Sequence, residues 1–163
     1  MKKSVAIMIA IIFVASILVI NLFGLKMSVY NETFPVTKIE CINKEENGVT
    51  ISSTLYPVDG ATTPESQWKR IPVINIKYTG PADEANNTGT MFFIQTRVYP
   101  DNATEKRVQF INYSNSIDAE LYVDASGNPN GLILFHAPSA ILVKVSTMEK
   151  NNLTSMFVMV IAR

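Results

Sequence analysis

One stretch of the sequence spaces oxygen-bearing side chains as a calcium-binding loop does. Residues 124–131 read DASGNPNG, with an Asp, a Ser and two Asn at alternate positions. An EF-hand loop needs glycine at its sixth position and a bidentate glutamate at its twelfth, where this sequence has Pro129 and Phe135. Asp, Asn, Ser and Gly are also the residues that turns favour. We therefore expect a turn between two strands and assign no metal ligand to it.

Histidine and cysteine, which often carry chemistry, occur once each, as His136 and Cys41. No nucleophile or acid stands in a known motif with His136, so we expect it at a strand end rather than as a general base. Cys41 has no disulfide partner and lacks the companions of a zinc site, so we expect a small buried side chain on a strand. The acid pairs at 45–46 and 83–84 are interpreted as solvated loop charges. The sequence thus predicts no catalytic, cofactor-binding or metal-binding residue, no cofactor and no enzymatic activity.

Two features of the sequence are relevant to the binding or the covalent attachment of carbohydrate. An aromatic sugar-binding platform could be formed by Trp68 and Tyr56, although packing of Trp68 in the core is the simpler interpretation. Asn-x-Ser/Thr sequons are numerous in a chain so rich in these residues, and composition alone would produce several. The sequons lie at Asn31, Asn86, Asn102, Asn112 and Asn152.

The first part of the chain has the character of a membrane anchor. Residues 5–25 contain no charge, and a helix of that length spans about 30 Å, the thickness of the hydrocarbon core of a bilayer. Lys2 and Lys3 precede the segment and Lys26 follows it. The positive-inside rule then places the N-terminus in the cytoplasm and the remainder outside. We predict a single-pass plasma-membrane protein whose membrane partner is contacted through residues 5–25.

A cleaved signal peptide is the main alternative for this segment, and a buried soluble helix is a third. Cleavage requires a shorter apolar region followed by small residues, whereas residues 21–28 read NLFGLKMS, with bulky side chains. The small residues Val14-Ala15-Ser16 lie in the middle of the apolar segment. We therefore expect an uncleaved anchor over residues 1–26, followed by a juxtamembrane linker over residues 27–36.

Beyond the linker the pattern is that of short strands separated by turns. No segment of 10 or more residues there has a helical apolar period, and turn residues such as Asn47-Gly48 and Gly80-Pro81 recur between β-branched runs. Many short strands with frequent turns are typical of a β-sandwich, so an all-β fold is predicted. The candidate strands are residues 37–42, 49–56, 73–78, 91–99, 107–113, 120–123, 132–136, 141–147 and 155–161.

Short motifs from the first part of the chain recur further along the sequence. Tyr56-Pro57 returns as Tyr99-Pro100, each shortly before an Ala-Thr pair and then a Gln-aromatic pair. Pro35-Val36 likewise returns as Pro72-Val73. We interpret residues 37–71 as a half-repeat that adds strands to the sandwich of residues 72–163. The alternative is a rudimentary domain packed against a complete one.

The second copy has a recognisable set of segments at residues 72–76, 97–104, 119–127, 131–133 and 140–147, together with the strand that ends in Phe110. In these segments it resembles the group 2 bacterial immunoglobulin-like domains of intimin- and invasin-like surface proteins. The resemblance covers about residues 72–161 and departs from the family pattern at Phe110, where tryptophan is usual. It implies an immunoglobulin-like β-sandwich that acts as a surface spacer or adhesive module without catalytic residues.

Charge excludes one class of partner. The chain carries 14 basic and 14 acidic side chains without a basic stripe, so we expect no nucleic-acid partner. The leading hypothesis is a membrane-tethered extracytoplasmic module that binds a protein or glycan at the cell surface. A pilin-like subunit with an assembly helix is the alternative, but Lys3-Ser4-Val5 lacks the Gly-aromatic processing site and the early Glu of type IV prepilins. An enzyme of unrecognised type is the third possibility.

Overall fold

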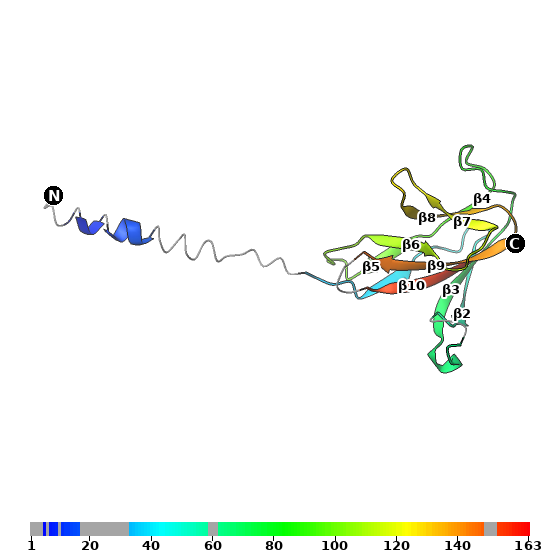
Figure 1. Ribbon diagram of the computed structural model, residues 1–163, viewed down its shortest axis with the longest axis horizontal. Helices are drawn as coiled ribbons and strands as arrows, with labels where there is room; N and C mark the ends of the chain where they lie inside the picture. The colour runs from blue at the N-terminus through cyan, green and yellow to red at the C-terminus, as the bar shows by residue number, and fades with distance from the viewer. Residues whose placement is uncertain (1–4, 6, 10, 17–32, 59–61, 149–152) are drawn as a thin grey trace. The chain divides into compact units, whose positions relative to one another are not determined.

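The computed structural model describes residues 5, 7–9, 11–16, 33–58, 62–148 and 153–163, in two compact units, Met1–Thr33 and Phe34–Arg163. In the first unit the described residues between 5 and 16 are helical (Figure 1), and the Ser16 hydroxyl donates to the Ile12 carbonyl (2.9 Å). None of the helices in the described residues is long and apolar enough to cross a membrane. Most of the predicted anchor, and the predicted linker as far as residue 32, lie outside the described residues.

The regular elements described in the second unit are strands apart from one short 3-10 helix, which confirms the all-β prediction. Each candidate strand overlaps an observed one, but the single strand predicted over residues 91–99 was wrong. That segment forms two strands because its first half pairs with β8 and its second half with β1. The elements are β1 Lys38–Cys41, β2 Thr50–Tyr56, the 3-10 helix η1 Glu65–Gln67, β3 Lys69–Ile76, β4 Thr90–Phe93, β5 Thr96–Tyr99, β6 Val108–Asn112, β7 Ala119–Val123, β8 Pro129–Phe135, β9 Ser139–Thr147 and β10 Ser155–Ala162.

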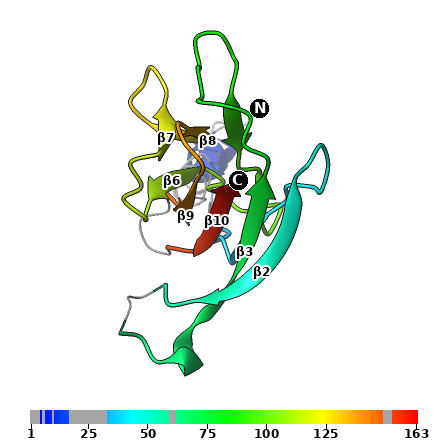
Figure 2. The same cartoon turned by 90° about the vertical axis from the view of Figure 1, so that its right-hand side faces the viewer.

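The strands form three sheets. The largest has the order β2-β3-β10-β9-β6, the second has β4-β8-β7, and the third is the pair β1-β5. All neighbours are antiparallel except β3 and β10, which run parallel. Figure 2 shows β2 and β3 as a long curved hairpin that continues past the end of β10. The segment predicted as a half-repeat therefore supplies β2 to the largest sheet and β1 to the smallest.

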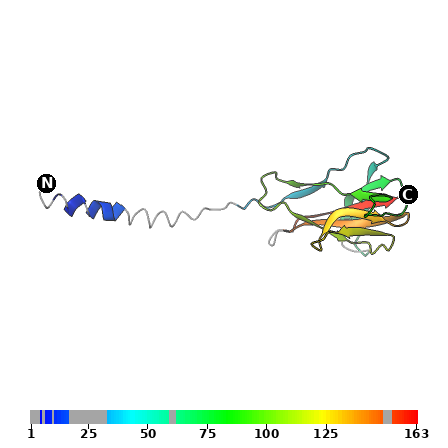
Figure 3. The ribbon, with the colours of Figure 1, turned by 90° about the horizontal axis from the view of Figure 1, so that it is seen from above.

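One apolar cluster joins the three sheets. Alternate residues of β9 and β10 point into it from the large sheet, and Ile133 and Phe135 of β8 point into it from the second sheet. Ile39 of β1 and Val98 of β5 complete the cluster from the third sheet. Figure 3 shows the two larger sheets from the side, with β9 and β10 in orange and red. Burial of this shared core, at about 25 cal/mol per Å² of apolar surface, is what holds the sheets together.

A second, smaller cluster lies on the opposite face of the large sheet. It contains Val58, Ile71, Leu142 and Phe157, with Tyr56 and Met159 packed against it. The Tyr113 ring meets the Phe157 ring edge-on, with centroids 5.2 Å apart, and the Tyr113 hydroxyl donates to the Val58 carbonyl (3.4 Å). These contacts attach the loop after β2 to the sheet.

Candidate interaction surfaces

A large groove lies between β6 and β7, which are edge strands of the two larger sheets. Its volume is about 810 Å³. Its walls are mainly apolar, with Phe110 and Leu121 at the core side and Ile111, Val123 and Met148 exposed near the opening. Exposed apolar side chains gathered along a groove are typical of a binding surface.

The backbone of β6 offers unpaired hydrogen-bonding groups to this groove. Met148 donates its backbone N–H to the Arg107 carbonyl, and Tyr113 donates its backbone N–H to the Leu142 carbonyl. The backbone N–H and C=O groups of the odd-numbered residues along β6 therefore point toward β9. Because residues of an antiparallel strand alternate in direction, the backbone groups of Val108 and Phe110 face away from β9, at the free edge. A free strand edge of this kind is a template for pairing with another extended chain.

The two charged residues of the groove lining, Arg107 and Glu120, have opposite charges, and each has a side-chain partner. Arg107 binds Glu105 through its guanidinium (2.6 Å) and its backbone N–H (2.9 Å), and these hydrogen bonds lower the pKa of Glu105 to about 2. Glu120 lies 3.1 Å from the Nε2 of His136. The lining is therefore close to neutral and favours an uncharged, extended ligand.

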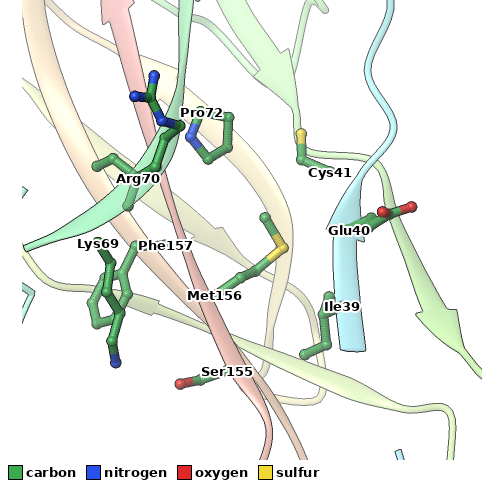
Figure 4. A pocket seen from close by; sticks show the side chains of 10 residues that line it. Ile39, Glu40, Cys41, Lys69, Arg70, Pro72, Ser155, Met156 and Phe157 are labelled. Atoms are coloured by element: carbon green, nitrogen blue, oxygen red, sulfur yellow. The ribbon is translucent and has the colours of Figure 1, made fainter. Parts of the chain in front are cut away.

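A smaller cavity of about 380 Å³ lies where β3 separates from β10 (Figure 4). Arg163 donates its backbone N–H to the Ile76 carbonyl, and the Arg163 carbonyl accepts the backbone N–H of Tyr78. The backbone groups of the even-numbered residues of β3 therefore point toward β10. Pro72 is such a residue and has no N–H to donate, so the ladder between the two strands ends there. We call the space where β3 and β10 separate the fork. The Met156 side chain extends into it from β10 toward Cys41 of β1, so the fork is lined by an apolar side chain.

Polar residues around the fork do not converge on it. Glu40 points away from the cavity (Figure 4) and forms an ion pair with Lys38, whose hydrogen bond lowers the pKa of Glu40. Arg70 donates to the Ser53 hydroxyl (3.1 Å) at the adjoining strand. The fork therefore has the features of a break in a sheet rather than those of a chemical site.

Of the residues predicted as a turn, 124–131, residues 124–128 form the loop between β7 and β8, whereas residues 129–131 belong to β8, which begins by pairing with Val123. The Asp124 carboxylate accepts the backbone N–H groups of Ser126 (2.8 Å) and Asn128 (3.1 Å), and Gly127 donates to the Asp124 carbonyl. These bonds are those of an Asx turn, in which the carboxylate organises the chain. No group of three or more metal-ligating His, Cys, Asp or Glu side chains occurs in the described residues.

His136 and Cys41, the single histidine and cysteine, lie apart. His136 directly follows β8, as expected, and is partly exposed beside Glu120. Cys41 is the last residue of β1 and is half-buried rather than fully buried. Burial raises the pKa of the Cys41 thiol, whose sulfur lies 3.1 Å from the Asn43 amide oxygen. A raised pKa suppresses the reactive thiolate.

The acid pairs and the aromatic pair also occupy separate places. All four acids at 45–46 and 83–84 are exposed. Glu45 accepts the backbone N–H of Ile51, and Asp83 accepts from Asn86 in a turn. Trp68 is half-buried, donates its indole N–H to the Thr63 carbonyl (2.8 Å) and belongs to neither core cluster, whereas Tyr56 packs against the smaller cluster. The core interpretation of Trp68 is therefore replaced by a role in shaping the loop before β3.

The predicted sequons are found at exposed Asn86 and Asn102 and at half-buried Asn112. The Asn112 amide oxygen accepts from both the backbone and the hydroxyl of Ser114, so this side chain is already used within the fold. Asn31 and Asn152 lie outside the described residues.

The groove itself was missed at the level of sequence, because its two walls come from strands in different sheets. The sequence predicted a strand over residues 107–113, but not that this strand would lie at the edge of a sheet. Comparison of the chain with protein-family models, curated proteins and solved structures found no match.

Proposed function

We propose that the chain is a membrane-tethered, extracytoplasmic, immunoglobulin-like module that binds an extended segment of a protein partner. Strand order supports the immunoglobulin-like assignment. When β4, β6, β7, β8, β9 and β10 are taken as strands B, C, D, E, F and G, the sheets have the orders B-E-D and G-F-C. These are the strand neighbours of an immunoglobulin sandwich. The resemblance of residues 72–161 to group 2 bacterial immunoglobulin-like domains points the same way.

The tether is proposed from residues 5–25, which carry no charge and are flanked by lysines. In this arrangement the strands would lie outside the membrane, where a surface groove would be available to a partner. The group 2 resemblance supports a role at the surface, because members of that family serve as spacers or adhesive modules.

The observation that carries the binding role is the apolar groove between β6 and β7. Its free edge presents backbone donors and acceptors at every second residue of β6, which an extended polypeptide matches along its whole length. Its walls are apolar and its charged groups are paired. A glycan offers hydroxyl groups rather than a strand of alternating donors and acceptors, so a peptide segment is the better fit.

Selection of peptides on the full chain held in a lipid nanodisc would test this function. We expect selected peptides to alternate apolar residues, and Val123→Lys to weaken their binding by about tenfold or more, because a charge would be placed in the groove. Leu153→Lys is the matched control, because Leu153 is exposed (71%) and does not line the groove. Equal binding to the wild-type chain and the Val123→Lys variant would refute the groove as the site, and failure to select any peptide would refute the proposed function.

A further inference from the structure

The strand β2 forms the other edge of the large sheet and lacks the usual protection of an edge. Its seven residues, TISSTLY, contain no charge, proline or glycine, and its pairing with β3 runs without a bulge. Natural edge strands are commonly protected by lysine, proline or a bulge, because an open edge pairs with other chains. Ser52, Ser53, Thr54 and Leu55 are all exposed. This edge is therefore a candidate surface for strand pairing.

One hydrogen bond shows which backbone groups of β2 point away from β3. Ile51 donates its N–H to the Glu45 carboxylate (2.8 Å), so its backbone faces away from β3. Alternation places the backbone groups of Ser53 and Leu55 on the same outer edge. Glu45 covers only the Ile51 end, so the N–H groups of Ser53 and Leu55 remain available to a second strand.

The side-chain order of β2 is nearly the same read in either direction from Ser53. Ser52 corresponds to Thr54, Ile51 to Leu55, and Thr50 to Tyr56. If two copies met antiparallel about Ser53, each of these residues would face its counterpart across the two strands. Hydroxyl pairs, aliphatic pairs and β-branched–aromatic pairs are all favourable cross-strand neighbours. Leu55, which is 50% exposed, would gain a partner in Ile51, which packs against the core.

Charge at the two ends of β2 also favours this orientation. Glu45 and Glu46 lie before its first residue, whereas Lys69 is paired with Tyr56 at its last residue; the Arg70 guanidinium instead donates to Ser53 (3.1 Å). An antiparallel arrangement brings the acidic end of one copy beside the basic end of the other, twice. A parallel arrangement would bring like charges together.

We infer that two copies of the chain associate through antiparallel pairing of their β2 strands, with a two-fold axis at Ser53. The two five-stranded sheets then continue into one another. This interface goes beyond the proposed binding of a peptide, because the β6–β7 groove lies at the opposite edge of the same sheet and stays accessible. A two-fold contact closes on itself and does not generate a filament.

Cysteine cross-linking of the full chain in membranes tests the register. In a Cys41→Ser background, Ser52→Cys is produced with one affinity tag and Thr54→Cys with another. The pairing places residue 52 opposite residue 54 of the second copy, about 4.5 Å apart between Cα atoms and within disulfide range. Two copies of Ser52→Cys alone would be separated by about 7–8 Å, which is beyond that range.

We expect the mixed sample to form disulfide dimers about tenfold or more above either single variant. Ser53→Pro provides a second measurement, because it removes an outward N–H and no backbone hydrogen bond to β3. Its control is Ser53→Ala, because both variants lose the hydroxyl that accepts from Arg70. Relative to Ser53→Ala, Ser53→Pro should weaken dimerisation by about tenfold and leave peptide binding at the groove unchanged. Equal cross-linking in all samples, cross-linking of Ser52→Cys alone, absence of any cross-link, or an undiminished Ser53→Pro dimer would each overturn the inference.

Discussion

A methyl group placed on Gly131 would lie 2.8 Å from the Cζ atom of Phe110, closer than a carbon contact allows. Gly131 is in β8 and has a φ of 91°, and Phe110 is a buried residue of β6. The bare glycine thus lets the aromatic ring of one sheet pack on the backbone of the other. We predict that Gly131→Ala lowers the free energy of unfolding by about 2–5 kcal/mol, from the left-handed backbone and the overpacked ring together.

Denaturant unfolding of Gly131→Ala beside Gly127→Ala separates these two costs. Gly127 has a similar φ of 80°, but no atom lies within 4 Å of an added Cβ. Its substitution should cost only about 1–2 kcal/mol. Adding Phe110→Leu to Gly131→Ala should cost less than the two single losses together, because the smaller side chain leaves room for the methyl group. Equal losses for the two glycine variants would contradict the packing explanation.

The strands themselves were predictable because alternation and turn residues are local signals. Asn47 and Gly48 adopt the positive φ that the Asn-Gly turn signal implies (55° and 85°). The division of residues 91–99 into β4 and β5 was not predictable, since it depends on partners distant in sequence. Ile94 donates to Gly131 and Ile42 donates to Gln95, so the chain leaves one sheet for another at these residues. Strand pairing of this kind is a tertiary property.

The candidate sites, too, were predictable only where they depend on residues close together in sequence. Residues 124–131 could be interpreted as a turn because Asp124 bonds to residues near it in sequence. The groove, by contrast, joins Phe110 of β6 to Val123 at the end of β7, and the free edge that gives it a function appears only when the sheet order is known. The open edge of β2 likewise required the register of β2 on β3.

The small cluster beneath the β2–β3 loop provides another prediction. Val58 is 2% exposed among Ile71, Leu142 and Phe157, so Val58→Ala should cost about 2 kcal/mol through lost burial and a residual cavity. Trp68, the single tryptophan, lies in this loop. We expect its emission to change at a lower denaturant concentration than the far-ultraviolet circular dichroism, because the loop detaches first. Ile117→Ala, at a 91% exposed site, should leave both transitions within experimental error; coincident transitions in Val58→Ala would contradict a separately attached loop.

The Glu105–Arg107 pair at the rim of the groove predicts a titration. The pKa of Glu105 is lowered from 4.5 to about 2, chiefly by its hydrogen bond to the Arg107 side chain. A lowered folded-state pKa means that the pair stabilises the fold above about 4.5, and that this contribution is lost as the pH falls through about 2. The pair is exposed to solvent, so high salt should weaken the effect. NMR titration of the Glu105 carboxyl carbon should show the low midpoint in the wild type and a return toward 4.5 in Arg107→Gln; identical midpoints in the two proteins would contradict this origin of the shift.

The N-terminal segment yields the prediction on which the proposed location depends. Residues 5–25 contain no charge and end in the bulky residues Leu22, Phe23 and Leu25, which disfavours signal-peptide cleavage. Mass spectrometry of the chain purified from membranes should therefore find residues 5–25 still attached, and alkaline carbonate should fail to release the chain. Replacing Ile12 and Val14 by arginine should release it, because each charge at the centre of a spanning helix costs about 2.5–3.5 kcal/mol. A mature chain that begins near Ser28 would instead identify a cleaved signal and remove the tether from the proposed function.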